Sequence, residues 1–182
     1  MRAGGAVPPP RGMLLDRLED AGVSVYSVGK IFEVFLGHGI GGHVKTVSNA
    51  DGMARTLAAL ETEPSGLIFV NLVDFDMLYG HRNDVEGYGR ALEEADAWLP
   101  SLLDKLTAGD LLLLTADHGC DPTTPSTDHS REYVPLLAYA PRRPRGSDLG
   151  VRSSLSDIGQ TVAENFGVQI MKGTSFLSEI IQ

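Results

Sequence analysis

The chain has 182 residues, of which 42% are hydrophobic and 21% charged, and its formal net charge is −9. This length suits one domain with a buried core, and no apolar run approaches the ~20 residues that cross a bilayer, which argues against a membrane protein. The acidic balance, without an extended basic face, argues against a nucleic-acid partner. A single cysteine and a first segment without the apolar stretch of a secretory signal indicate a cytoplasmic protein.

The chain divides into a short tail and one patterned region. Residues 1–12 are rich in Gly and Pro and predict a disordered N-terminal tail. Over 13–182 the pattern predicts helices near 13–20, 31–36, 48–60, 84–106, 156–166 and 174–181, and strands near 23–28, 44–47, 66–73, 111–114 and 134–139. Strands that alternate with helices in this way predict an α/β fold, a mainly parallel sheet with helices on both faces.

One apolar run leads directly into polar side chains that can bind a ligand. The leucines at 111–114, bounded by polar residues, predict a strand covered on both faces. Asp117 and His118 follow this strand, and Asp128 and His129 lie eleven residues further on. Ligands of open α/β sheets collect beyond the carboxyl ends of such strands. We therefore expect a functional site in this loop.

The strand near 66–73 ends in a similar polar segment, which carries Asp76 and His81. These two residues are five apart, which on an α-helix would separate them by roughly 140°, so we expect a loop to bring them together. With Asp117, His118 and His129 they form a set of five candidate ligands. Carboxylate and imidazole ligands suit Mn, Zn or Fe, and paired ions commonly serve phosphoryl transfer. Any one of these residues could instead cap a helix, but the set predicts a metal site.

Two other patterns resemble functional motifs but lack the required context. The glycines of GHGIGGH at 37–43 follow a helix-like run rather than a strand, which favours a plain connection over a dinucleotide-binding loop. Cys120 lies near His118 and could suggest a Cys–His nucleophile. A histidine bound to metal cannot act as the base for a thiol, so we interpret Cys120 as a small packed residue.

Five segments carry a more specific signal. They are SVGKI at 27–31, SNADG at 48–52, NLVDFDMLYGHRND at 71–84, TADHG at 115–119 and DPTTPSTDHSREYVP at 121–135. Together they resemble the phosphopentomutase family of the alkaline phosphatase superfamily, over residues 12–182. The long Asp-His motifs make this resemblance specific.

The resemblance implies an isomerase of nucleotide and pentose phosphate metabolism, which interconverts ribose or deoxyribose 1-phosphate and 5-phosphate. It implies two Mn²⁺ ions, a phosphorylated threonine and a sugar phosphate as the small-molecule partner. Asp76, His81 and His129 would bind one ion, and Asp117 and His118 the other. Lys30, at the GKI position, would contact the substrate phosphate, and a solvated surface lysine is an equally open alternative.

The chain also departs from the family. An early metal-binding aspartate, a nucleophilic threonine and an inserted cap domain have no counterpart, so 13–182 resembles only the C-terminal portion of an alkaline-phosphatase-like core. The loop threonines Thr123, Thr124 and Thr127 lack a helix N-terminus that would favour a phosphorylated anion. We therefore assign no catalytic nucleophile and expect a lone chain to be inactive.

Such a portion would need the missing N-terminal half as a partner, or would associate with itself through exposed strand edges. Two alternatives remain open. One is another phosphomutase of the superfamily, such as a cofactor-independent phosphoglycerate mutase, or a phosphodiesterase. The other is an inactive fragment that binds metal.

Overall fold

A computed structural model describes residues 7–143 and 146–181. The predicted tail over 1–12 lies partly outside the described residues, and 7–12 consist of coil and turn. The helices are α1 (Leu14–Asp20), α2 (Ile31–Val34), α3 (Asn49–Thr62), α4 (Val85–Leu103), α5 (Ser156–Asn165) and α6 (Leu177–Ile181), with the short irregular helices η1 (Phe75–Tyr79) and η2 (Gly80–Arg82). The strands are β1 (Val25–Val28), β2 (Gly42–Val44), β3 (Leu67–Val70), β4 (Leu112–Thr115) and β5 (Leu136–Tyr139).

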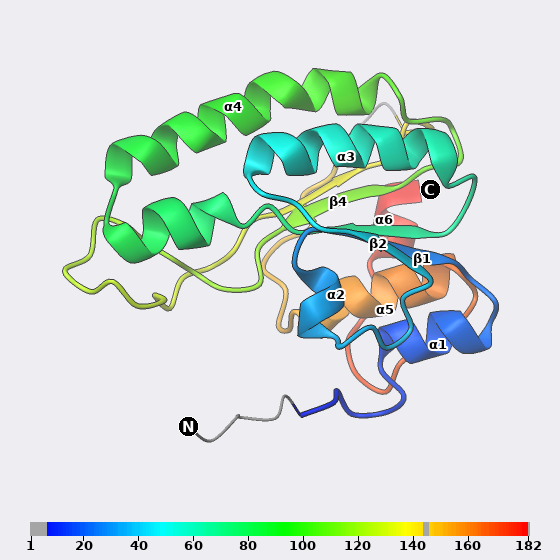
Figure 1. Ribbon diagram of the computed structural model, residues 1–182. Helices are drawn as coiled ribbons and strands as arrows, with labels where there is room; N and C mark the ends of the chain where they lie inside the picture. The colour runs from blue at the N-terminus through cyan, green and yellow to red at the C-terminus, as the bar shows by residue number, and fades with distance from the viewer. Residues whose placement is uncertain (1–6, 144–145, 182) are drawn as a thin grey trace.

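The strands form two sheets. A three-stranded parallel sheet has the order β2-β1-β3, and β4 pairs with β5 in a two-stranded antiparallel sheet. Figure 1 shows α3 and α4 over one side of the strands and α1, α2 and α5 over the other. The predicted α/β fold with a parallel sheet and helices on both faces is confirmed, whereas the antiparallel pairing of β5 with β4 has no signal in local pattern.

The turn between α1 and β1 directs the chain into the parallel sheet. The Gly22 N–H donates to Glu19 O and the Val23 N–H to Leu18 O, while Gly22 adopts a φ of 72°. This pair of bonds is the usual end of a helix whose chain must reverse, and glycine adopts the left-handed conformation without a steric penalty. Leu18 and Val25 are thereby buried in one cluster, against the side chains of α5.

Strand β4 is less buried than its sequence predicts. Leu113 and the preceding Leu111 pack against the cluster formed by Phe176, Leu177 and Ile180. All three leucines of β4 nevertheless keep partial exposure. The expectation of a strand buried on both faces is therefore wrong for these leucines. Among the described residues β4 pairs only with β5, so its other edge has no strand whose side chains could help to cover it.

Helices α3 and α4 begin close to their predicted starts, each after a capping side chain. Ser48 Oγ accepts a hydrogen bond from the Asp51 N–H at 3.2 Å, and Asp84 Oδ1 accepts one from the Gly87 N–H at 2.8 Å. Each bond satisfies an N–H that the first helical turn leaves without a partner. These caps fix the two helices that flank the polar segment after β3.

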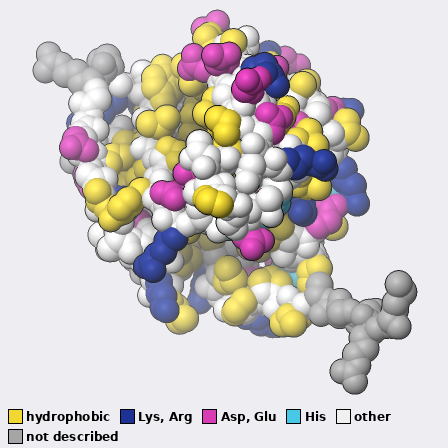
Figure 2. All heavy atoms as spheres, turned by 90° about the vertical axis from the view of Figure 1, so that its left-hand side faces the viewer, with side chains coloured by type: hydrophobic (Ala, Val, Ile, Leu, Met, Phe, Trp, Pro, Cys, Tyr) yellow, Lys and Arg dark blue, Asp and Glu magenta, His cyan; other side chains and the backbone are white. Residues whose placement is uncertain are grey.

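The surface carries mixed charge. On the face shown in Figure 2, acidic and basic side chains are interspersed among hydrophobic ones rather than segregated. None of the helices within the described ranges is both long and apolar enough to cross a bilayer.

Two glycines with positive φ allow a matched test of the fold. Gly29 has a φ of 87°, and a Cβ there would collide with the Asn71 carbonyl at the end of β3, whereas a Cβ at Gly22 would meet open space. We expect Gly29→Ala to lower the free energy of unfolding by about 2–3 kcal/mol, and Gly22→Ala by about 1 kcal/mol. Urea denaturation of both variants measures the difference. Equal losses would show that the approach of β1 to β3 is not tight.

Candidate metal centre

The segment after β3 folds into a widened helical turn. The Gly80 N–H donates to Phe75 O, and the Asp84 N–H donates to Tyr79 O at 3.0 Å, so both bonds span five residues. In such a π-type turn, two side chains five residues apart lie on more nearly the same side of the helix axis than they would on an α-helix. His81 Nε2 consequently lies 3.3 Å from Asp76 Oδ1. The expectation of a loop is wrong here, because η1 and η2 bring the two side chains together.

The segment after β4 returns to the same place as a closed loop. The Ser130 N–H donates to Gly119 O at 3.1 Å in an isolated antiparallel bridge, and Ser130 Oγ accepts from the Asp121 N–H at 2.9 Å. This closure carries His129 back beside η1, where its Nε2 lies 3.1 Å from Asp76 Oδ1. The ten residues between His118 and His129 therefore belong to a loop whose ends meet.

Hydrogen bonds from the loop hold the turn in register. Asn83, which follows η2 in the left-handed conformation at φ 51°, donates through Nδ2 to Thr124 O at 3.1 Å. His81 Nδ1 lies 2.6 Å from Thr127 O. Because a carbonyl oxygen only accepts, His81 Nδ1 donates in this contact, which leaves Nε2 as the ring nitrogen that can bind a metal. This is the arrangement in which a histidine binds a metal, with a carbonyl fixing the ring.

Asp76, His81 and His129 form a compact donor cluster. One ligand atom from each lies within 4.8 Å of the other two, and the three side chains are partly exposed. Both Nε2 atoms point at the same carboxylate oxygen. One carboxylate oxygen and two imidazole nitrogens fit a divalent first-row metal and leave coordination positions for other groups.

Asp117 and His118 lie beside this cluster rather than in it. The His118 ring stacks on the His129 ring at 3.7 Å between centroids and 20° between planes. His118 Nε2 is 3.7 Å from Asp117 Oδ1, and the Asp117 side chain is 82% exposed. The structure thus brings three of the five predicted ligands into one donor cluster, with His118 stacked against it and Asp117 exposed at its edge.

Lys30 lies in a different part of this face. It is exposed and lines a cavity of about 170 Å³ together with Gly29, Glu33, Lys45, Thr46, Val73 and Met77. Met77 belongs to η1, so the cavity adjoins the turn that carries Asp76. Lys45 pairs with Glu33 at 2.8 Å and holds the pKa of that carboxyl below its usual value. Local pattern had not indicated Lys45 or Thr46, because only the packing of β2 beside β1 brings them to Lys30.

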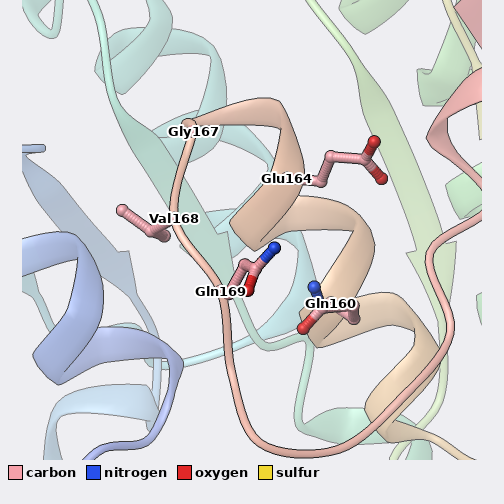
Figure 3. A pocket seen from close by; sticks show the side chains of 5 residues that line it. All are labelled: Gln160, Glu164, Gly167, Val168 and Gln169. Carbon is pink, nitrogen blue, oxygen red and sulfur yellow. The ribbon is translucent and has the colours of Figure 1, made fainter.

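A second cavity, of about 350 Å³, lies at the C-terminal end of α5 (Figure 3). Its lining consists of Gln160, Glu164, Gly167, Val168 and Gln169. None of the predicted ligands lines it, and the Gln160 amide oxygen already accepts a bond from the Ile170 N–H. The hollow is therefore separate from the candidate metal centre.

Cys120 packs against the turn. Burial raises the pKa of its thiol, and the neighbouring Asp76 carboxylate raises this pKa further. A neutral thiol is a poor nucleophile and a poor metal ligand. The structure thus agrees with the interpretation of Cys120 as a packed residue.

The contact between Gly80 and Cys120 offers a test of this packing. A Cβ at Gly80 would collide with Cys120 Sγ and lie 3.0 Å from Phe75 O. We expect Gly80→Ala to lower the free energy of unfolding by about 1–3 kcal/mol through overpacking. Cys120→Ala in the same chain should recover part of this loss, and the single Cys120→Ala variant completes the double-mutant cycle by urea denaturation. Strict additivity would contradict direct contact.

The fold and the donor cluster together define an α/β protein with a candidate metal centre in the loops that follow its strands. The sequence profile of the metalloenzyme superfamily matches residues 19–170, so the chain belongs to that superfamily. It is 62% identical over 175 residues to a phosphopentomutase of Anaeromyxobacter sp., and 53% identical over 177 residues to one of Desulfitobacterium hafniense. These matches cover 96% and 97% of this chain but 45% and 46% of the relatives.

The chain thus spans less than half the length of the curated relatives it matches. Its fold is similar to that of a phosphoglycerate mutase from Leishmania mexicana, with a TM-score of 0.64 and 19% identity, over 87% of this chain and 37% of the other. The expected resemblance to part of a phosphopentomutase, within a metalloenzyme superfamily, is confirmed. The roles of the individual site residues remain predictions.

Proposed function

We propose that this chain forms one part of a phosphopentomutase, an isomerase that moves a phosphoryl group between positions 1 and 5 of ribose or deoxyribose. The observation that carries the proposal is the 62% identity to such an enzyme over 96% of the chain. The donor cluster at Asp76, His81 and His129 supports it, because phosphoryl transfer commonly uses carboxylate- and imidazole-bound ions. The substrate class is a small sugar phosphate.

The metal in this proposal is Mn²⁺, which carboxylate and imidazole ligands suit. Asp76, His81 and His129 hold one ion, and Asp117 and His118 contribute to a second. Bound Mn²⁺ would neutralise charge on the transferring phosphoryl oxygens. Thr127 O orients the ring of His81 for this role, and the Asp76 carboxylate faces both imidazoles.

Lys30 has a separate role in the proposal, as a contact for the substrate phosphate. Its ammonium group is exposed at a cavity that adjoins η1. The nearby Lys45 is paired with Glu33. A lysine that is not held by a carboxylate can pair with a phosphate as a point charge.

In this proposal, the remaining parts of the active site are supplied by a complementary polypeptide. Among the described residues β3 pairs only with β1, and β4 only with β5, so each keeps one edge without a strand partner. A complementary N-terminal half that supplies the nucleophilic threonine could also pair with such an edge. Without it, the same edges favour self-association.

Metal binding is testable on this chain directly. We expect calorimetric titration to detect Mn²⁺ uptake by the unaltered chain, and His129→Ala to weaken it by about tenfold or more, because one of three clustered donors is lost. His43→Ala is the control, since His43 stacks on Phe32 away from the cluster. Undetectable uptake by the unaltered chain would contradict the metal site.

The mutase activity needs a second assay. We expect the lone chain not to convert ribose 1-phosphate to ribose 5-phosphate, and the chain mixed with an N-terminal half of a phosphopentomutase to do so. The lone chain is expected to be inactive because no nucleophilic threonine is assigned in it. A panel with 3-phosphoglycerate and a phosphodiester tests the alternatives of another phosphomutase or a phosphodiesterase. No turnover of any substrate by the mixture would favour an inactive metal-binding fragment.

A further inference from the structure

A pair of buried polar residues joins α3 to the turn that carries Asp76. The Asn49 N–H donates to Asp74 Oδ2 at 2.6 Å, and the Asp74 N–H donates to Asn49 Oδ1 at 2.9 Å. Asn49 is 6% exposed and Asp74 is 9% exposed. The two residues lie 25 apart in sequence, so this reciprocal pair, the Asn49–Asp74 clamp, is a tertiary contact.

The hydrogen bonds of the clamp include one to a charged acceptor at a helix N-terminus, which makes the clamp stronger than a pair of neutral hydrogen bonds. The Asp74 carboxylate accepts from the first residue of α3, a helix of fourteen residues, where the helix dipole favours a negative charge. Hydrogen bonds to a charged group are roughly twice as strong as neutral ones. Breaking the clamp would leave buried polar groups without partners, so its geometry is hard to distort.

The clamp also lies next to the turn that carries the candidate ligand Asp76. Asp74 is the N-cap residue directly before η1, and Asp76 is the second residue of that turn. Asp74 has no side-chain bond that caps η1 itself, because its carboxylate is directed to α3. At the other end, Asp84 caps α4 through the Gly87 N–H. The widened turn is thus anchored by one aspartate on each side.

We propose that the Asn49–Asp74 clamp is a positioning device for the candidate metal centre. It fixes the start of η1 so that the Asp76 carboxylate meets the imidazoles of His81 and His129. Neither clamp residue is itself a ligand in this inference, which rests on the metal site proposed above. Loss of the clamp lets the turn shift, and a shift at Asp76 disturbs both contacts because the two Nε2 atoms face one oxygen.

The test begins with Mn²⁺ titration of the unaltered chain by calorimetry. We expect Asn49→Ala to weaken Mn²⁺ binding by about tenfold or more, the size of effect seen when groups that orient ligands are lost. The matched control is Thr56→Ala. Thr56 is also buried on α3 and loses a bond to Gly52 O at 2.8 Å, but it has no hydrogen bond to the turn. We expect this control to bind within about twofold of the unaltered chain.

An exchange of the two side chains separates positioning from general stability. Asn49→Asp alone places two carboxylates against each other and should weaken binding like Asn49→Ala. The double variant Asn49→Asp with Asp74→Asn restores one carboxylate and one amide, each able to accept from the opposite N–H. We expect it to recover Mn²⁺ affinity to within about threefold. The visible absorption of bound Co²⁺, which reports ligand number and arrangement, should recover with it.

The Mn²⁺ titrations of these variants can support or overturn the clamp. Weakened binding in both single variants at Asn49, with recovery in the exchange and no loss in Thr56→Ala, supports the clamp. Unchanged binding in Asn49→Ala, or equal losses in Thr56→Ala, overturns it and leaves the metal site standing. Should Asn49→Ala fail to fold, the Asn49→Asp variant and the exchange still decide, because failure of the exchange to recover affinity overturns the clamp. No uptake by the unaltered chain overturns the metal site and the clamp together.

Discussion

Two backbone hydrogen bonds that span five residues, from Gly80 to Phe75 and from Asp84 to Tyr79, widen the turn on which the geometry of the candidate metal centre depends. On an α-helix, Asp76 and His81 would lie roughly 140° apart and could not share an ion. The widened turn brings His81 Nε2 to 3.3 Å from Asp76 Oδ1. His129 can join them only because the bridge from Ser130 to Gly119 closes its loop. Two local departures from regular structure therefore assemble one cluster.

Much of the fold, and the proximity of Asp76, His81 and His129, were predictable from sequence, because both rest on local signals. The apolar runs marked the strands, the helices expected near 48–60 and 84–106 begin close to their predicted starts, and Asp or His residues after the strands marked the site. The widened turn was not predictable in this way. It depends on Cys120 packing against Gly80 and on Asn83 donating to Thr124 O, contacts between residues about forty apart in sequence.

The partial exposure of β4 was missed for a related reason. Four leucines in a row indicate a strand that can be buried, but burial also needs a layer on each face and a strand at each edge. The cluster of Phe176, Leu177 and Ile180 supplies a packing surface, and β5 supplies the edge that the structure describes. A local sequence pattern carries no information about which strands lie beside β4 in the fold.

The two sets of candidate ligands differ in how firmly the chain holds them. Thr127 O and the shared Asp76 oxygen orient His81 and His129, so three donors already converge. Asp117 is largely exposed, and no described side chain other than His118 is paired with it. A site with two donors has fewer bonds with which to offset the dehydration of an ion. Any ion held by Asp117 and His118 therefore depends on ligands from outside this chain more than an ion held by the Asp76 cluster does.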